Sequence, residues 1–450
     1  MTTETTETTP ATRTAGTTTG TPPTPAAPGA TAAPATSGTT APAAATATAA
    51  ATTSAAATAT AGGPAGTAEM LKRVREFVRA ELLSKGEYFD GLPEQPTAES
   101  ARLHAAGLAN WWIPAAYGGA GASLADSVDI VSELAYGDAG FAFGAFLPVL
   151  GTVMLQLHGE EEAARPVLER LVRDGGRLGI LGSEEDAGSE LNRTATTFRR
   201  DGDDLVLDGE KYFSTNSDPA DTLLVLARSA DDDGDYAVVA VPRATPGVEI
   251  VKRWDMLGVR GSGTYRVRLR DCRTPAAGRL RGNGLRLLEI GLNASRILIA
   301  ATAIGVARRI RDLSMEYAAE KRIKGAPLRE NAVFAAKLGQ IEMTIDVMRN
   351  QCRAAAAEFD RFLAAENPAA ALYRVGTLRS ALAAKLYCGQ AGWEVATTGS
   401  EMFGGLGYTH DHPIGKLVRD LRYVSIVEGG DDVMRELLYA RYVVPAGKRR

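Results

Sequence analysis

The feature that most restricts the fold of this 450-residue chain is its hydrophobic pattern, which changes twice along the sequence. Residues 67–175 place apolar side chains at helical spacing, whereas residues 176–275 contain short β-rich runs separated by Asp-Gly turns. Residues 276–445 return to helical spacing over longer stretches. Because the short runs follow one another without helices between them, the pattern predicts an α+β fold: a helical N-terminal domain, a middle antiparallel β-barrel or sandwich, and a C-terminal long-helix bundle.

Several elements can be placed within these blocks. Ser123 is a candidate N-cap for a helix that ends near residue 136, and the apolar run 141–157 predicts one buried helix. Long helices joined by short connections favour an antiparallel bundle, and we expect them over residues 285–321, 330–365 and 369–402. A strand-like stretch over 423–427 precedes a final helix that begins near Asp431.

Composition separates the first 66 residues from the rest. Residues 1–66 consist mainly of Thr, Ala and Pro and contain no Leu, Ile, Val, Phe, Tyr or Trp. Such a segment buries nothing that could offset an ordering cost of about 1–2 kcal/mol per residue, so we predict a disordered tail. The net charge of −4 and the scattered Lys and Arg residues disfavour nucleic-acid binding.

The compartment can be predicted from cysteine spacing and hydropathy. Cys272, Cys352 and Cys388 lie far apart and form no disulfide framework or zinc motif, which favours a cytoplasmic protein. No run of about 18 apolar residues and no secretory signal is present, so we expect no membrane span. His410 and His412 could ligate a metal, but a surface turn before Pro413 is favoured, and we predict no metal site.

The remaining motifs together resemble the acyl-CoA dehydrogenase family of flavoproteins, over about residues 67–445. The resemblance implies a flavin adenine dinucleotide (FAD) cofactor and the family's α–β–α architecture. It rests on six segments in the family's order: 113–119 (IPAAYGG), 181–190 (LGSEEDAGSE), 208–216 (DGEKYFSTN), 257–264 (LGVRGSGT), 403–408 (FGGLGY) and 419–429, which ends in Ile-Val-Glu-Gly.

The family's chemistry removes two hydrogens from adjacent carbons beside a thioester carbonyl. A carboxylate takes the α-proton, and the β-hydrogen leaves as hydride to flavin N5. Glu428 falls where most members carry this base, although an acid near a helix start also has a purely structural reading. Other members keep the base on the long bundle helix, where this chain has Ser295 before Arg296.

The resemblance also assigns cofactor and substrate residues. The predicted flavin contacts include Phe213, which could otherwise be an ordinary core aromatic, and Gly405, which could otherwise simply end a helix. The predicted substrate contacts lie along the thioester arm, where Arg296 could instead be an ordinary paired charge. The full sets are Ser183, Phe213, Thr215 and Gly405 for FAD, and Ser189, Arg296 and Gly429 for the substrate.

The chain departs from the family pattern where FAD is held across a subunit interface. An expected arginine is Lys321, a nearby aromatic is Lys324, and an expected glutamine is Glu401. Arginine and lysine are not equivalent where a planar guanidinium group binds a phosphate through two hydrogen bonds. Further departures are Glu185, Asn293, Asn331 and the sequence Gly430-Asp431 after the base.

We therefore expect an FAD-dependent acyl-thioester α,β-dehydrogenase acting on acyl-CoA or on an acyl group held by a carrier protein. The electron acceptor would be an electron-transfer flavoprotein or oxygen, and the enzyme a homodimer or homotetramer without nucleic-acid or membrane partners. A flavin oxidase or monooxygenase of specialised metabolism is the main alternative. A non-catalytic homologue is the other, motivated by the altered interface positions.

Overall fold

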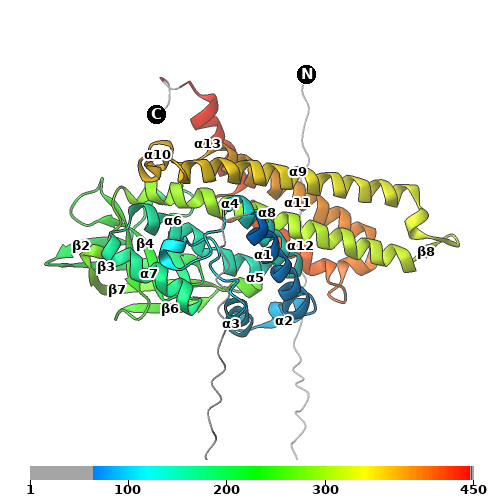
Figure 1. Cartoon of the computed structure of the whole chain (residues 1–450), viewed down its shortest axis with the longest axis horizontal. Coiled ribbons are helices and arrows are strands. Elements are labelled where there is room, and N and C mark those ends of the chain that lie inside the picture. Colours follow the sequence, from blue (N-terminus) through cyan, green and yellow to red (C-terminus); the bar gives the residue numbers. More distant parts are fainter. Residues whose placement is uncertain (1–63, 446, 448–450) are drawn as a thin grey trace, which may run out of the picture. The chain divides into compact units, whose positions relative to one another are not determined.

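The computed structural model describes residues 64–445 and 447, and its elements follow the order helical, β, helical (Figure 1). The predicted α+β fold class is confirmed. The predicted tail over 1–66 lies outside the described residues, except for its last residues, which begin helix α1 (Pro64–Phe77).

The N-terminal part of the described chain is helical, as predicted. Helix α4 begins after Ser123, whose side chain accepts a hydrogen bond from Asp126 N at 3.0 Å. The α-helices that follow α1 in this part are α2 (Gly86–Gly91), α3 (Thr97–Ala105), α4 (Leu124–Gly137), α5 (Ala139–Phe146), α6 (Pro148–His158) and α7 (Glu161–Asp174).

The prediction of one buried helix over 141–157 is wrong. The segment is buried, but it forms the two helices α5 and α6, and the second begins at Pro148. Proline has no backbone N–H to donate and its ring crowds the preceding turn, so it starts a helix more readily than it continues one. Hydrophobicity alone did not reveal this break.

The middle part forms one seven-stranded sheet, in which β5 pairs with β4 and the others follow the order β1-β4-β2-β3-β7-β6. Most pairs are antiparallel, but β4 pairs parallel with both β1 and β2, so the predicted wholly antiparallel pairing is wrong there. The strands are β1 (Leu178–Leu181), β2 (Thr197–Asp201), β3 (Asp204–Thr215), β4 (Thr222–Ser229), β5 (Tyr236–Pro242), β6 (Val248–Arg253) and β7 (Thr264–Pro275).

Strand β4 is apolar on both faces. Leu223 and Val225 belong to a core made by the strands themselves, whereas Leu224 and Leu226 belong to the core shared with the helices. Successive side chains of a strand point to opposite faces, so a strand covered on both sides carries a continuous apolar run. The β domain thus packs against helices on one face and closes its own core on the other.

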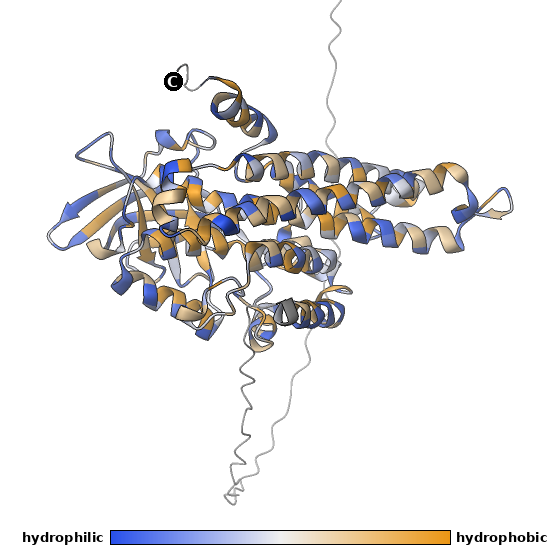
Figure 2. Ribbon diagram, turned by 45° about the horizontal axis from the view of Figure 1, so that its top comes forward, coloured by the Kyte–Doolittle hydropathy of each residue, from blue (hydrophilic) through white to orange (hydrophobic). Residues whose placement is uncertain are grey.

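The C-terminal part is built on long helices that carry hydrophobic and hydrophilic stripes (Figure 2). Helices α8 and α11 run in the same direction, because Gly392 packs on Ala303 and Gly399 on Ile310. Helix α9 runs against both. The elements are α8 (Gly284–Glu320), β8 (Arg322–Ile323), β9 (Ala326–Pro327), α9 (Ala332–Leu363), α10 (Pro368–Val375), α11 (Arg379–Met402), α12 (Ile414–Arg422) and α13 (Asp431–Leu438).

Two predictions in this region are wrong. The helix expected over 369–402 is broken into α10 and α11 at Gly376, which has a φ of +71° and whose N–H still bonds Leu372 O. The strand-like stretch 423–427 is instead a 3₁₀ turn, Tyr423–Ser425. Its β-branched and aromatic side chains resemble those of a strand, but the backbone turns here to lead from α12 to α13.

A buried ionic cluster ties the three parts together. Lys416 of α12 pairs with Asp138, which caps α5, at 2.7 Å, and with Asp420 on its own helix. Asp420 also accepts a hydrogen bond from Val259 N at 2.7 Å, in the loop between β6 and β7. One lysine therefore links an N-terminal helix, a β-domain loop and the helix that precedes residue 428.

Two helical stretches of the described chain are long and apolar enough to cross a membrane, Ala139–His158 and Gly284–Glu320. Their most hydrophobic windows are 83% and 94% buried inside the protein. Such burial is the usual environment of core helices, and it is the reason for their composition here.

Candidate active site

Glu428 lies in a strained turn between the Tyr423–Ser425 segment and α13. Its φ is +53°, and Gly429 follows with a φ of +97°. A non-glycine residue in this left-handed region is uncommon, and it persists where surrounding contacts hold it. The turn is therefore a place where the fold fixes a side chain at an energetic cost.

Side chains from two long helices hold the turn. Ser295 Oγ of α8 donates to Glu428 Oε1. The neighbouring Arg296 donates from Nε and Nη2 to the backbone oxygen of Glu428, at 3.1 and 2.9 Å. Lys385 Nζ of α11 donates to the backbone oxygen of Gly429 at 2.7 Å. Both carbonyls of the turn thus accept hydrogen bonds from cations.

The Glu428 carboxylate is poorly solvated. Its Oε2 is buried and has no hydrogen-bond partner among the described residues. Burial raises the pKa of Glu428 to about 7, against the opposing effects of the Ser295 hydrogen bond and the charges of Arg296 and Lys385. A carboxyl group that titrates near neutral pH is suited to accept and release a proton in turnover.

Ser183 is fixed at the end of β1 by a buried ion pair. The adjacent Glu184 carboxylate accepts from Lys211 Nζ at 2.7 Å and from Thr196 N at 3.0 Å. Ser183 O accepts from Tyr212 N at 2.8 Å. These bonds join the loop after β1 to β3, so the predicted flavin residue Ser183 and those of β3 share one edge of the β domain.

Phe213 forms an exposed aromatic surface on β3. Its φ is +52°, 56% of the residue is exposed, and its ring stacks on that of Trp254 with centroids 4.7 Å apart. Nearby Thr215 is buried, with Oγ1 3.0 Å from Thr264 Oγ1. Phe213 is therefore not the ordinary core aromatic that its strand position allows.

The loop after β6 connects this surface to the helix that leads to Glu428. Trp254 N donates to Thr264 O at 2.8 Å, which fixes the start and end of the loop. At Gly258 a Cβ atom would lie 2.3 Å from Arg419 O of α12, so only glycine permits this approach. The aromatic surface is thereby tied to α12, whose end continues into the Glu428 turn.

Gly405 lies elsewhere in the protomer. It follows α11, beside Phe403, whose ring packs 4.7 Å from that of Tyr317 at the end of α8. Lys385 lies near the start of α11, so at 1.5 Å per residue the end of that helix is about 25 Å from the Glu428 turn. The structure does not bring Gly405 together with Glu428 within one chain.

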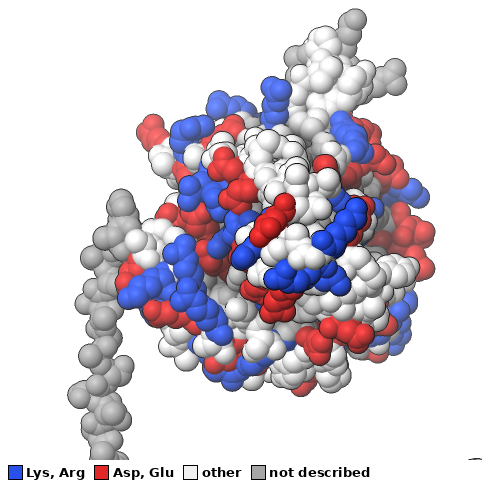
Figure 3. All heavy atoms as spheres, turned by 90° about the vertical axis from the view of Figure 1, so that its right-hand side faces the viewer, with Lys and Arg blue, Asp and Glu red and all other residues white. Residues whose placement is uncertain are grey.

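Several departures from the family pattern lie at this same end of the bundle. Lys321 and Lys324 are exposed around the β8–β9 hairpin. Glu401 pairs with Lys337 of α9 at 3.0 Å, and Asn331 caps α9 by accepting from Val333 N at 3.0 Å. Figure 3 views this end, where charges of both signs alternate with uncharged surface.

The predicted substrate residues differ in exposure. Ser189 is exposed in the loop after β1, whereas Arg296 is only 5% exposed and its guanidinium is bonded to Glu428 O. Asn293, which replaces an aspartate of the family pattern, is buried between α8 and the α10–α11 connection. Its amide bonds the backbone of Gly376 and Leu378 at 2.8 and 2.7 Å.

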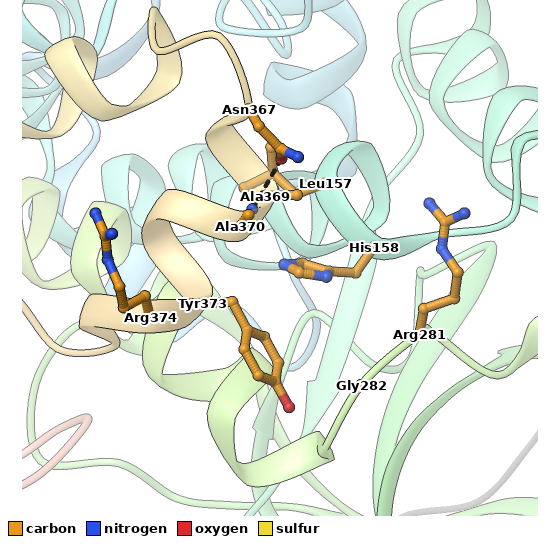
Figure 4. Close-up of a pocket in the computed structure, with 9 residues that line it drawn as sticks. All are labelled: Leu157, His158, Arg281, Gly282, Asn367, Ala369, Ala370, Tyr373 and Arg374. Atoms are coloured by element: carbon orange, nitrogen blue, oxygen red, sulfur yellow. Dashed lines mark hydrogen bonds between the residues drawn. The ribbon is translucent and has the colours of Figure 1, made fainter.

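A separate pocket of about 490 Å³ lies beside the start of α8 and of α10 (Figure 4). His158 is buried there, and its Nε2 has no partner among the described residues. No predicted site residue lines this pocket, whose lining is Leu157, His158, Arg281, Gly282, Asn367, Ala369, Ala370, Tyr373 and Arg374. Within residues 64–445 and 447, no group of three or more His, Cys, Asp and Glu side chains could hold a metal.

Sequence reasoning missed Lys385. This lysine is fully buried on a helix face formed by Ala381, Ala384 and Cys388. A charged residue at an apolar helix position is a usable signal, because lysine is almost never fully buried without a partner. Its contact with Gly429, however, joins residues far apart in sequence and could not be inferred from spacing.

Comparison with known proteins identifies the family. Models of its N-terminal, middle and C-terminal acyl-CoA dehydrogenase domains match residues 65–175, 179–272 and 282–443. The chain belongs to the acyl-CoA dehydrogenase family. It is 30% identical over 379 residues to the probable acyl-CoA dehydrogenase YngJ of Bacillus subtilis. That match covers 82% of this chain and 96% of the relative.

Solved acyl-CoA dehydrogenases share the fold. Butyryl-CoA dehydrogenase from Megasphaera elsdenii superposes with a TM-score of 0.75 at 24% identity, over 82% of this chain and 96% of that one. An acyl-CoA dehydrogenase complexed with FAD from Bacillus anthracis gives 0.78 at 22% identity, over 85% and 67%. As a member of this family, the protein is a flavin oxidoreductase that uses FAD.

The described residues fit that cofactor. The exposed Phe213 ring on Trp254 offers an aromatic surface to a planar ring system, and Trp254 Nε1 is buried without a partner among the described residues. At the other end of the bundle, Gly404 and Gly405 have open space where a Cβ would stand. The hairpin with Lys321 and Lys324 follows the end of α8, which packs against Phe403 at this same end. Open glycine backbone and cations suit a pyrophosphate.

Proposed function

We propose that this enzyme catalyses the FAD-dependent α,β-dehydrogenation of an acyl thioester, with Glu428 as the base. The observation that carries the proposal is the Glu428 carboxylate, whose Oε2 is buried and which is held in a strained turn by groups from α8 and α11. Family membership supplies the reaction class, and the geometry supports the assignment of the base.

Glu428 would take the proton from the α-carbon. Its Oε2 has no hydrogen-bond partner among the described residues, so this oxygen is free to accept the proton, whereas Oε1 is occupied by Ser295 Oγ. Poor solvation makes the carboxylate a stronger base than one in water. The electron pair left on the α-carbon forms the new double bond as the β-hydrogen departs as hydride.

When bound, FAD supplies the hydride acceptor, N5 of its ring. We assign Ser183, Phe213 and Thr215 to the ring, because they share one edge of the β domain. Gly405 lies too far from Glu428 in the same chain to join them, so it would bind FAD held largely by a second copy. A homodimer or homotetramer is therefore part of the proposal.

The thioester is proposed to lie between the exposed loop that carries Ser189 and the turn at Gly429, with Arg296 behind the turn. Coenzyme A and an acyl-carrier protein both present such a thioester, and both remain proposed carriers. We propose that an electron-transfer flavoprotein or oxygen reoxidises the cofactor. A cytoplasmic location is also proposed, since it suits both coenzyme A and an acyl-carrier protein.

The base assignment is tested with Glu428→Gln in the FAD-loaded enzyme. Mixed anaerobically with a panel of acyl thioesters, the wild type should lose its flavin absorbance. The variant should do so at least about 100-fold more slowly, because an amide cannot take the proton. Asp432→Asn, an exposed carboxylate of α13, is the matched control and should behave as wild type. Fast bleaching by Glu428→Gln would refute the assignment.

A further inference from the structure

The two carbonyl oxygens of the Glu428–Gly429 turn are each held by a buried cation. Arg296 of α8 is 5% exposed and donates twice to Glu428 O, and Lys385 of α11 is 0% exposed and donates to Gly429 O. The two cations come from the parallel helices α8 and α11. The hydrogen bonds of Arg296 to this turn and that of Lys385 go to backbone oxygens and not to carboxylates.

This arrangement is expensive to build. A fully buried ammonium group loses most of its hydration, which a single neutral carbonyl does not replace. The loss lowers the pKa of Lys385 to about 8 and that of Arg296 to about 10. A buried lysine that served packing alone could be replaced by an apolar side chain, so its presence points to a function at the turn it holds.

We propose that Lys385 is a positioning residue: with Arg296 it clamps the strained turn and so fixes the direction in which the Glu428 carboxylate points. The inference rests on the proposed role of Glu428 as the base. Without the Lys385 bond, Gly429 O loses its donor and the turn can relax away from its positive φ values. The carboxylate would then no longer be held toward the substrate's α-carbon.

Lys385 also contributes its charge. The groups that face Glu428 are Ser295 and Arg296 from α8, Lys385 from α11 and Tyr423 from the preceding turn. Asp431 of α13 lies near Lys385 and favours its charged form, because a nearby anion raises the pKa of an ammonium group. Because Lys385 and Arg296 both favour ionised Glu428, removal of Lys385 should make the base harder to ionise.

The experiment compares FAD-loaded wild type with Lys385→Met and Lys385→Gln. Gln390→Met, an exposed position on the same helix, is the matched control. Infrared difference spectra over a pH titration, without substrate, report the protonated carboxyl band that Glu428→Gln lacks. We expect its midpoint to rise by about one pH unit in both Lys385 variants. Anaerobic flavin reduction by both Lys385 variants should remain about tenfold slower than that of the wild type at high pH. There Glu428 is ionised in all three proteins, and the Lys385 amine of the wild type, even when neutral, still donates to Gly429 O.

Three outcomes would overturn the inference. One is an unchanged infrared midpoint, and another is full recovery of the reduction rate at high pH. The third is failure of both Lys385 variants to retain FAD and a cooperative thermal transition, which would make Lys385 a folding residue. If Glu428→Gln itself reduced flavin normally, the proposed function would fail instead, and the infrared titration would show which of the two is wrong.

Discussion

Glu428 differs from the acids around it by its environment, not by its residue type. Asp432, one turn later on α13, has a 98% exposed side chain paired with Arg435, whereas Glu428 Oε2 is buried. Desolvation disfavours the charged form of the buried Glu428 carboxylate and so raises its pKa. One short stretch of chain therefore contains a candidate base next to acids that only favour a helix start.

This environment predicts a pH dependence. Since the base works in its ionised form and its pKa is raised to about 7, kcat/KM should rise with pH and reach half its maximum near pH 7. A carboxylate with an ordinary pKa would already be fully active well below that. The measurement is anaerobic flavin reduction at low thioester concentration from about pH 5.5 to 8.5. A rate that is flat over this range would contradict the assigned environment.

At the same scale, the sequence predicted the candidate base but not what surrounds it. Glu428 follows a recognisable segment, and Ser295 and Arg296 were singled out on α8. That Arg296 bonds the backbone oxygen of Glu428, and that Lys385 joins it, depends on contacts between distant segments. The assigned roles of the cofactor and substrate residues stay predictions.

At the scale of elements, periodicity located the helices better than their ends. Helix α8 spans the predicted 285–321 almost residue for residue, because its apolar pattern is uninterrupted. The break at Pro148 falls inside an apolar run, where burial on all sides hides a change of direction. The break at Gly376 is a single glycine between two stretches that both have helical spacing. The parallel pairs of β4 were also beyond the sequence, since strand composition does not report the direction of a neighbour.

The ionic cluster of α12 should matter for stability. In Lys416→Met, Asp138 and Asp420 keep their buried charges without the cation, so the free energy of unfolding should fall by about 3–5 kcal/mol. Urea titration of the FAD-loaded protein measures it. Arg353→Met, which breaks an exposed pair with Asp129, is the control and should lose no more than about 1 kcal/mol. Equal losses in the two variants would show that the cluster does not tie the parts together.

At the scale of the molecule, the fold separates the assigned cofactor residues into two groups. Ser183, Phe213 and Thr215 lie on the β domain near the loop that reaches α12, whereas Gly405 and the cationic hairpin lie at the far end of the bundle. The end of α11, next to Gly405, lies about 25 Å from the Glu428 turn of the same chain, so we propose that FAD bound to the β domain of one copy contacts Gly405 of a second copy. The homodimer or homotetramer stays a prediction, and the separation of Gly405 from the Glu428 turn within one chain is the structural reason for it.

The reaction proposed for this flavoprotein removes two hydrogens from an acyl thioester. The direct test is mass spectrometry of the products formed from acyl-CoA and acyl-carrier thioesters, with an artificial electron acceptor and without oxygen. The product should lack two hydrogens and carry an α,β double bond. A reaction that proceeds only with oxygen and adds an oxygen atom to the product would contradict it.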